Sequence, residues 1–389
     1  MKRLYWRPAG PSALALCLLG ALALGLVRTV EHFPLRIEQG ASATKRAAAE
    51  RAERAFAAIR EERPRRGLPL VDRNDRAGTG LIGPSSTSIT TSAGSLPAKR
   101  TAANPNFAAA LVDMLLDLGL KRGDVVAIGY SGSFPALNIA TLAAADTLGL
   151  VPLSIASAAS SDFGASAPQF SWLDMEVLLV SRGLVSRGSV AASIGGIEDR
   201  GIGLGAEGLA VLEGAIQRSG AARLTSDDFE ASLSERMEHY ERAAGDRAIR
   251  AYVNVGGGAV SVGRSRGKMV YQPGINRPAG KAPVDSIIGR FLDRGVPVIH
   301  LSHVEDLARA YELPLDPAAP QRAGEGEIFV HVRPNVWLSL GAIAVLGVAL
   351  TVVGRRARAR AHLATLPDGV VGVEAAPGGP VAPPPPGLD

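Results

Sequence analysis

Cysteine and histidine are scarce in this sequence of 389 residues, which contains one cysteine and six histidines. The single cysteine, Cys17, lies in an apolar stretch near the N-terminus, so the rest of the chain can form no internal disulfide bond. His300 and His303 stand three residues apart, but no third ligand is spaced to complete a metal site with them. We therefore expect no metal and no cofactor, and we favour a structural or hydrogen-bonding role for both histidines.

Charged side chains are missing from two long runs, residues 8–27 and 334–354. Each run is about the 20 residues that a helix needs to cross the hydrocarbon core of a bilayer. Basic residues flank both runs on their outer sides, namely Lys2, Arg3, Arg7, Arg355, Arg356, Arg358 and Arg360. Because basic flanks stay on the cytoplasmic side of membrane helices, we expect both termini inside and the residues between the runs outside.

This topology predicts a two-pass protein of the inner cell membrane with an extracytoplasmic central domain. The predicted segments are a basic cytoplasmic N-terminus (1–10), a first transmembrane helix (11–30), a stalk helix followed by a Gly/Ser-rich loop (31–100), an α/β domain (101–313), a spacer (314–334), a second transmembrane helix (335–354) and a basic, then proline-rich cytoplasmic tail (355–389). A cleaved signal peptide is the alternative for the first apolar run, with small residues at 41–43 as the cleavage site. That site lies far beyond the run, so we favour an uncleaved anchor.

Net charge is absent from the middle of the chain. The formal charge of +5 divides into +4 for residues 1–30 and +1 for residues 355–389, which leaves residues 31–354 neutral. A basic sequence of this kind ordinarily suggests nucleic-acid binding. Here the basic excess flanks the apolar runs, so we expect no nucleic-acid partner.

Large side chains are rare in two segments that precede the predicted α/β domain. Residues 45–63 read as a helix of alanines and alternating charges, which has high helix propensity but little apolar surface to bury. We interpret it as a stalk or a partner-facing helix. Residues 84–95 (PSSTSITTSAGS) have the composition of a linker, although long ordered loops in compact domains are often functional.

From residue 104 onward, short apolar strands alternate with helices. The strands are expected at 125–129, 151–156, 190–194, 249–255 and 296–301, with helices at 107–118, 135–148, 173–182, 206–218, 227–244, 286–293 and 304–311. Continuous apolar strands separated by helices are typical of a parallel sheet that is covered on both faces. We predict a doubly wound α/β fold with a mostly parallel sheet.

Small and polar residues follow each predicted strand. They include Ser131 and Ser133 after the first strand, Asn254, Gly256 and Gly257 after the fourth, and His300 and His303 at the fifth. In open α/β sheets, ligands bind beyond the carboxyl ends of the strands. We expect these residues to converge on one site.

The turn at residues 129–135 (GYSGSFP), between a strand and a helix, is open to three interpretations. It could hold an anion through hydroxyls and N–H groups at the helix start. It could present Ser131 as a nucleophile, with Asp174 or Asp199 and His300 or His303 completing a triad, although Ser133 stands where that motif requires glycine. It could also be a plain tight turn, with Ser133 as the helix cap.

Several motifs resemble one family of membrane-anchored proteins. They lie at residues 4–7 (LYWR), 81–84 (LIGP), 90–96 (TTSAGSL), 99–101 (KRT), 104–107 (NPNF), 123–127 (GDVVA), 131–140 (SGSFPALNIA) and 172–176 (WLDME). This set is similar to the poly-gamma-glutamate system protein found beside bacterial components of poly-gamma-glutamate synthesis. The resemblance covers roughly residues 1–355 and implies a pathway rather than specific catalytic residues.

The resemblance adds a candidate ligand loop before residue 104, with Ser92, Ser95, Lys99 and Arg100, and places Asn138 in its most specific motif. Poly-gamma-glutamate carries a carboxylate on every unit, and hydroxyls, helix N-termini and a basic pair suit carboxylate recognition. The expected partners are the synthase subunits and the polymer or glutamate oligomers. Three functions stay open: handling of the polymer, hydrolysis or transfer of its gamma-amide bonds through Ser131, and assembly without catalysis.

Overall fold

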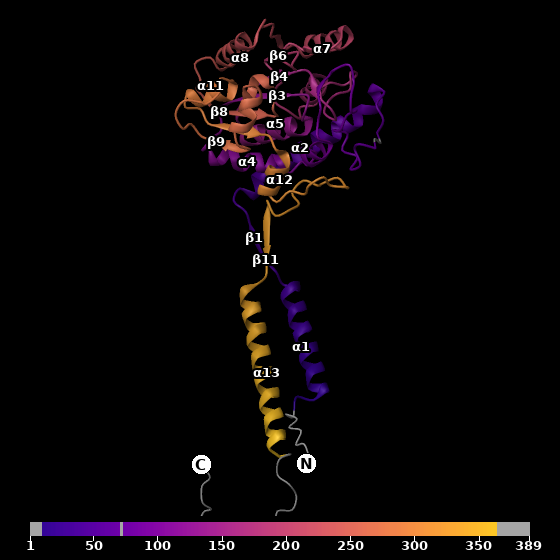
Figure 1. Ribbon diagram of the computed structural model, residues 1–389, viewed down its shortest axis with the longest axis vertical. Coiled ribbons are helices and arrows are strands. Elements are labelled where there is room, and N and C mark those ends of the chain that lie inside the picture. The colour runs from indigo at the N-terminus through magenta and orange to yellow at the C-terminus, as the bar shows by residue number, and fades with distance from the viewer. Residues whose placement is uncertain (1–9, 71–72, 364–389) are drawn as a thin grey trace, which may run out of the picture. The chain divides into compact units, whose positions relative to one another are not determined.

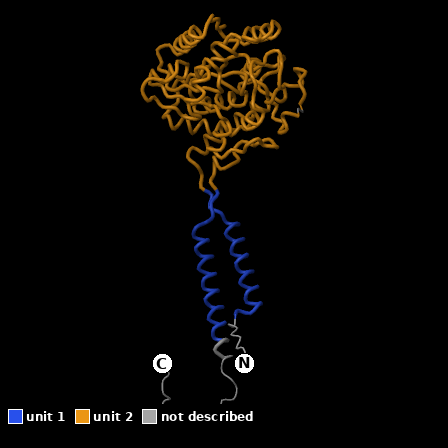
Figure 2. The backbone as a smooth tube through the Cα atoms, viewed as in Figure 1, with its two compact units in different colours: residues 1–36, 332–389 blue, residues 37–331 orange. Residues whose placement is uncertain are grey.

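The computed structural model describes residues 10–70 and 73–363, which form two compact units. Residues up to 36 and from 332 onward make up the first unit, and residues 37–331 make up the second (Figure 2). Residues 1–9 and 364–389 lie outside the described residues, so most of the predicted N-terminus and of the proline-rich tail falls there.

The first unit contains two long apolar helices, α1 (Ala13–His32) and α13 (Val336–Leu363). Many of their apolar side chains are exposed, as in Leu14 and Leu24, each 70% exposed, and Ile343, 67% exposed. The membrane-like stretches cover Ala13–His32 and Val336–Ala359, and none of their hydrophobic window is buried within the protein. Both helices are long and apolar enough to cross a membrane, as the two charge-free runs predicted.

A seven-stranded sheet organises the second unit (Figure 1). Its spatial order is β7 (Ala222–Arg223), β6 (Ala191–Ser193), β4 (Val151–Ser157), β3 (Val125–Ser131), β8 (Ile249–Val255), β10 (Val298–Leu301) and β9 (Gly274–Asn276). Neighbouring strands are parallel except for β9, which runs antiparallel to β10 at one edge. The α/β class with a mostly parallel sheet is therefore confirmed, and the very short strands β7 and β9 were not predicted.

Helices cover both faces of this sheet because alternate strand residues point to opposite sides. On one face, Val126 and Ile128 of β3 join the larger buried cluster. This cluster contains side chains of α2 (Ser42–Glu62), α4 (Phe107–Asp117), α5 (Pro135–Leu148), α6 (Trp172–Ser181), α7 (Ala206–Ser219) and α12 (Val304–Ala310). On the other face, Val125 and Ala127 pack with α8 (Phe229–Ala244) and α11 (Ile287–Asp293).

The prediction that residues 45–63 form a stalk or a partner-facing helix is wrong, because α2 is part of the core. Ala48, Ala49 and Ala52 are fully buried, and the helix packs against α4 and α5. Alanine offers little area per residue, but its small side chain allows helices to approach closely, so a row of alanines makes a close-packed face. The charged residues of α2 lie largely on its other faces.

The expected spacer at 314–334 is also integrated into the second unit up to residue 331. Phe329 is fully buried, and the Asn106 side-chain amide donates to the carbonyls of Arg322 and Glu325 at 2.9 and 3.1 Å. Beyond it, β11 (Val330–Arg333) pairs with β1 (Leu35–Glu38) in a separate two-stranded sheet. The compact unit therefore spans residues 37–331 rather than 101–313.

Candidate functional site

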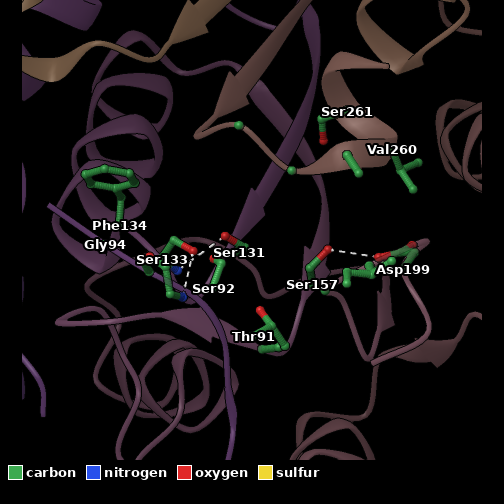
Figure 3. A pocket seen from close by; sticks show the side chains of 18 of the residues that line it. Thr91, Ser92, Gly94, Ser131, Ser133, Phe134, Ser157, Asp199, Val260 and Ser261 are labelled. Atoms are coloured by element: carbon green, nitrogen blue, oxygen red, sulfur yellow. Dashed lines mark hydrogen bonds between the residues drawn. The ribbon is translucent and has the colours of Figure 1, made fainter. Parts of the chain in front are cut away.

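A cavity of about 370 Å³ lies at the carboxyl ends of the central strands (Figure 3). It is bounded by the segments that follow β3, β4, β6 and β8, and by the serine-rich loop that precedes α3 (Leu96–Ala102). The polar residues that line it are Thr91, Ser92, Ser95, Lys99, Ser131, Ser133, Ser157, Ser161, Asp199, Arg236, Ser261 and Lys268. The convergence of strand ends that the sequence predicted is present for the first, second, third and fourth predicted strands.

The turn between β3 and α5 is held by its own hydroxyls. The N–H of Ser133 donates to Ser131 Oγ at 3.2 Å, and Ser133 Oγ accepts from the N–H of Ser161 at 3.1 Å. The Asn138 side-chain amide donates to the Ser131 carbonyl at 2.8 Å. Ser131 and Ser133 line the cavity, whereas Asn138 is fully buried and supports the turn from below.

The serine-rich segment before α3 is an ordered wall of the cavity and not a linker. Its strand β2 (Thr90–Ser92) pairs in parallel with β5 (Ser160–Ser161). Gly94 lies so close to this second strand that a Cβ atom there would be 2.3 Å from the Asp162 carbonyl oxygen. Ser95 then caps α3 by accepting from the N–H of Ala98 at 3.3 Å. The loop, with Ser92 and Ser95, therefore lines the cavity.

Lys99 enters the cavity wall from α3 and is 3% exposed. Its Nζ donates to the Ser133 carbonyl and to Ser161 Oγ, the latter at 2.7 Å, and lies 3.8 Å from the centre of the Phe134 ring. Burial lowers the pKa of Lys99 to about 7, with the charge of Asp162 acting in the opposite direction. Within the described residues, no carboxylate forms an ion pair with this lysine.

Arg100 does not reach the cavity. Its Nε donates to the Asn74 carbonyl at 2.6 Å, and its Nη1 lies 3.6 Å from Asp316 Oδ1. Successive residues on a helix point about 100° apart, so two adjacent basic residues cannot serve one site. The predicted basic pair is therefore split into one cavity residue and one structural residue.

A buried ion pair closes the far side of the cavity. Arg236 of α8 donates from Nη2 and Nε to Asp199 Oδ2 at 2.7 and 2.9 Å, and both side chains are 5% exposed. Ser157 joins them, since its hydroxyl donates to Asp199 Oδ1 at 3.2 Å and accepts from Arg236 at 3.0 Å (Figure 3). Asp199 is thereby neutralised by arginine, and within the described residues it has no hydrogen bond or ion pair with a histidine, which removes it as a triad member.

The two histidines line a neighbouring cavity of about 250 Å³. His300 is 2% exposed, and its Nδ1 lies 2.9 Å from the side-chain amide of Asn254, which also donates to the Gly256 carbonyl at 2.6 Å. Burial lowers the pKa of His300 to about 4, and the charge of His303 acts in the same direction. His300 is therefore neutral at pH 7, in a structural hydrogen-bond network.

Asn254 lies among structural contacts, whereas Gly256 lines the smaller cavity and Gly257 lines both cavities. Gly256 has a φ of +88°, which a residue with a side chain adopts only with strain, and this turn brings Gly257 to the cavities. Of the two candidate glycines, Gly257 thus lines the main cavity, and Gly256 lines only the smaller one.

The proposed catalytic triad is not assembled in the described residues. No hydrogen bond joins Ser131 to His300 or His303 there, and Ser131 Oγ accepts only from the N–H of Ser133. Asp174 instead caps α6 through Ser171, and its Oδ1 lies 2.9 Å from Arg218 Nη2. Without a base in reach, Ser131 has no group to take its proton.

Sequence reasoning did not single out Ser161, Arg236 or Lys268 as site residues, although Ser161 is among the polar residues that follow the second predicted strand. Ser161 was one of several serines after the second strand, and no local spacing distinguished it. Arg236 lies in the middle of a helix, 37 residues from Asp199, so only the fold brings the pair together. Lys268 lies on α10 (Arg264–Val270), a short helix that no periodicity indicated.

One group of potential metal ligands lies away from both cavities. His331 Nδ1 is 3.7 and 3.6 Å from carboxylate oxygens of Glu312 and Glu327, both of which are exposed. A histidine between two solvated carboxylates is an ordinary surface ion pair, so we assign no metal to it.

No protein-family model, curated protein or solved structure matches this chain. The function must therefore be argued from the cavity and its residues.

Proposed function

We propose that the chain is a membrane-anchored component of a poly-gamma-glutamate synthesis or export system, and that its α/β unit binds the polymer or its glutamate units in the 370 Å³ cavity. The observation that carries this proposal is the chemistry of the cavity wall. It combines hydroxyl groups on four converging segments with a surplus of positive charge. The motif resemblance supplies the identity of the polyanion.

The charge surplus follows from the lining residues. Of the described residues around the cavity, Lys99, Lys268 and Arg236 are basic and Asp199 is acidic. Arg236 and Asp199 cancel each other as a buried pair, which leaves Lys268 and Lys99, the latter only partly protonated at pH 7 because its pKa is about 7. Lys99 lies in the wall, and Lys268 is exposed at the rim, where it can meet a ligand carboxylate directly.

Hydroxyl donors suit the same ligand. Ser92, Ser131 and Ser133 lie on one side of the cavity, and Ser261 lies across from them (Figure 3). Hydroxyl and N–H donors bind a carboxylate more strongly than a neutral group, because one partner in each hydrogen bond is charged. A polymer with a carboxylate on every unit would use several such donors at once.

The order of the strands in the sheet explains why the cavity lies where it does. We propose that the sheet is doubly wound, because the chain leaves β3 for β4, β6 and β7 on one side and then for β8 and β10 on the other. Ligands of such sheets bind at the carboxyl ends where the winding direction reverses, which here is between β3 and β8. Ser131 is the last residue of β3, and Gly257 follows β8.

Membrane attachment and sidedness complete the proposal. The two exposed apolar helices would anchor the chain in the inner cell membrane, and the basic flanks would keep both termini in the cytoplasm. The α/β unit would then face outward, where the polymer emerges. Small residues such as Gly20 and Gly341, which have open space around them, would let the helices pack closely against synthase subunits.

Two alternative functions are an enzyme that acts through Ser131 and an assembly subunit without catalysis. An enzyme acting through Ser131 lacks a base at that serine, so the geometry disfavours it. An assembly subunit without polymer binding is supported by the two exposed helices alone, and it gives no reason for a cavity with surplus positive charge.

Calorimetric titration of the full-length protein in detergent with gamma-linked glutamate oligomers tests the proposal. We expect binding that weakens with salt, and no binding of the neutral gamma-linked isoglutamine oligomer of the same length, in which each alpha-carboxylate is replaced by a carboxamide. Lys268→Met should weaken binding about 3- to 10-fold, because an exposed charge contributes less than the ~1.5–3 kcal/mol of a buried charged hydrogen bond. Lys121→Met, an exposed lysine on a distant turn, is the matched control. Equal binding of the glutamate and isoglutamine oligomers would contradict the proposal.

A further inference from the structure

A lysine and a serine meet in the wall of the main cavity. Lys99 Nζ and Ser161 Oγ are 2.7 Å apart, and both residues line the cavity. Serine becomes a nucleophile when a neighbouring base takes its proton, and a desolvated lysine is one such base. We propose that Ser161 is a nucleophile and Lys99 its general base, in acyl transfer at amide bonds of a carboxylate-rich chain.

The contacts of Lys99 orient its amine for this role. A neutral amine has two N–H bonds and one lone pair, and the Ser133 carbonyl accepts one of those N–H bonds. The Phe134 ring covers the amine at 3.8 Å from its centre. The lone pair can then accept the proton of Ser161, because the remaining neighbour within hydrogen-bond distance is that hydroxyl.

Burial makes the neutral amine available near pH 7. The pKa of Lys99 is lowered to about 7, since burial disfavours the ammonium form and no ion-paired carboxylate compensates. A base with a pKa near the working pH combines a large deprotonated fraction with adequate basicity. Among the residues that the structure describes, no basic side chain is hydrogen-bonded to Ser131 Oγ, which distinguishes the two serines.

The serine-rich loop provides donors for the oxyanion that forms during attack. Ala93 and Gly94 line the cavity, and their backbone N–H groups donate to no acceptor within the described residues. The loop is held beside Ser161 because the N–H of Asp162 donates to the Ser92 carbonyl at 3.0 Å. Two such N–H groups beside a nucleophile can stabilise a tetrahedral intermediate.

The reaction balances without a cofactor. Ser161 Oγ attacks the amide carbonyl carbon while its proton passes to Lys99 Nζ. The C–N bond then breaks, Lys99 returns the proton to the leaving amine, and an ester on Ser161 is left. Water, or the amine of another chain, attacks this ester, and its proton passes through Lys99 to Ser161 Oγ. The choice of a carboxylate-rich substrate rests on the proposed function, whereas the nucleophile itself does not.

A fluorophosphonate probe tests the nucleophile on the full-length protein in detergent. Ser161 Oγ would attack phosphorus and release fluoride, and mass spectrometry of peptides would find the label on Ser161. The labelling rate should rise with pH and level off above about 7, as Lys99 loses its proton. Ser161→Ala should abolish labelling, and Lys99→Met should slow it by ~100-fold or more.

Lys99→Arg tests whether Lys99 acts as a base or only through its positive charge, because arginine keeps the charge but does not deprotonate. It should slow labelling as much as Lys99→Met does. Ser181→Ala and Lys121→Met, both at exposed positions outside the cavity, should label like the unmodified protein. Circular dichroism spectra identify any variant that fails to fold.

Label on a serine other than Ser161, or an unlabelled protein, would overturn the inference. Labelling that is as fast in Lys99→Met as in the unmodified protein would also overturn it. The result is separable from the proposed function. A protein that binds gamma-linked glutamate oligomers but takes no label refutes only the nucleophile, and a labelled protein that binds no oligomer refutes only the polymer site.

Discussion

Two lysines, Lys45 and Lys99, are equally buried at 3% exposure but have different surroundings. Lys45 lies on α2, where its Nζ is 2.6 Å from Asp113 Oδ2 and donates to the Ile328 carbonyl at 3.2 Å. Lys99 has neutral oxygen atoms and an aromatic ring as its neighbours. One buried cation is thus matched with an anion and the other is not.

The difference separates a structural role from a functional one. A buried charge is costly unless it is paired, so Lys45 and Asp113 stabilise the contact between α2 and α4 as a unit. No paired anion offsets the cost of burying the Lys99 ammonium group, so this lysine lowers the free energy of unfolding. Destabilised groups of this kind cluster where a ligand or a reaction uses them. The comparison therefore points to the cavity rather than to α2.

The largest expected effect is on the pH dependence of stability. The pKa of Lys99 is about 7 in the folded state and 10.5 when unfolded, so between these values the unfolded chain binds a proton that the folded chain does not. Stability should therefore rise with pH through this window, by on the order of 5 kcal/mol at most, and the full penalty applies below pH 7.

Lys99→Met should remove that rise and increase stability at pH 7 by about 2 kcal/mol, because the burial penalty exceeds the two lost hydrogen bonds. Urea denaturation of both proteins at pH 7 and pH 9.5 measures the difference. Lys121→Met is the control for a lysine in solvent. A variant with the same pH slope as the unmodified protein would show that Lys99 is not the origin of the effect.

The sequence predicts most of the α/β architecture because its signals are local. α5 runs from Pro135 to Leu148 as expected, since a proline begins the helix and Gly149 ends it. The apolar strands β3, β4, β8 and β10 are bounded by turn residues in the same way. Burial of α2 could not be predicted, because its alanines acquire their surroundings from α4 and α5, which lie far along the chain.

The cavity residues could be predicted only in part, because some of them meet only through contacts between segments that lie far apart in the chain. Ser131, Ser133 and Lys99 belong to recognisable segments, and they line the cavity. The contact between Lys99 and Ser161 spans 62 residues and depends on the pairing of β2 with β5. Such short strands carry no periodic signal, so no pattern in the sequence could distinguish Ser161 from Ser131 as the serine beside a base.

His300 provides a smaller test of the same principle, since it is a buried base that stays neutral. Its pKa is about 4 in the folded state and 6.5 when unfolded, so its contribution is fully present above pH 6.5 and is lost as the pH falls toward 4. The loss should be about 3 kcal/mol at most. His300→Gln, which can still accept from Asn254 but does not titrate, should flatten the stability profile between pH 6.5 and 4. An unchanged profile in urea denaturation would mean that other groups cause the acid sensitivity.

The smallest effect is expected at the paired lysine, where removal of the anion makes Lys45 resemble Lys99. Asp113→Asn leaves the ammonium group buried with one carbonyl contact, and breaking a fully buried pair costs ~3–5 kcal/mol. The Asp113 side chain is 32% exposed, so water can partly replace it and we expect a loss of about 2 kcal/mol in urea denaturation.

Asp117→Asn is the matched control, because Asp117 ends the same helix and pairs with Arg277 in solvent, where the loss should stay below about 0.5 kcal/mol. Adding Lys45→Met to Asp113→Asn should recover part of the stability, since no unpaired charge is left. If the double variant is no more stable than Asp113→Asn alone, the loss comes from packing, and the contrast between the two lysines is not one of charge.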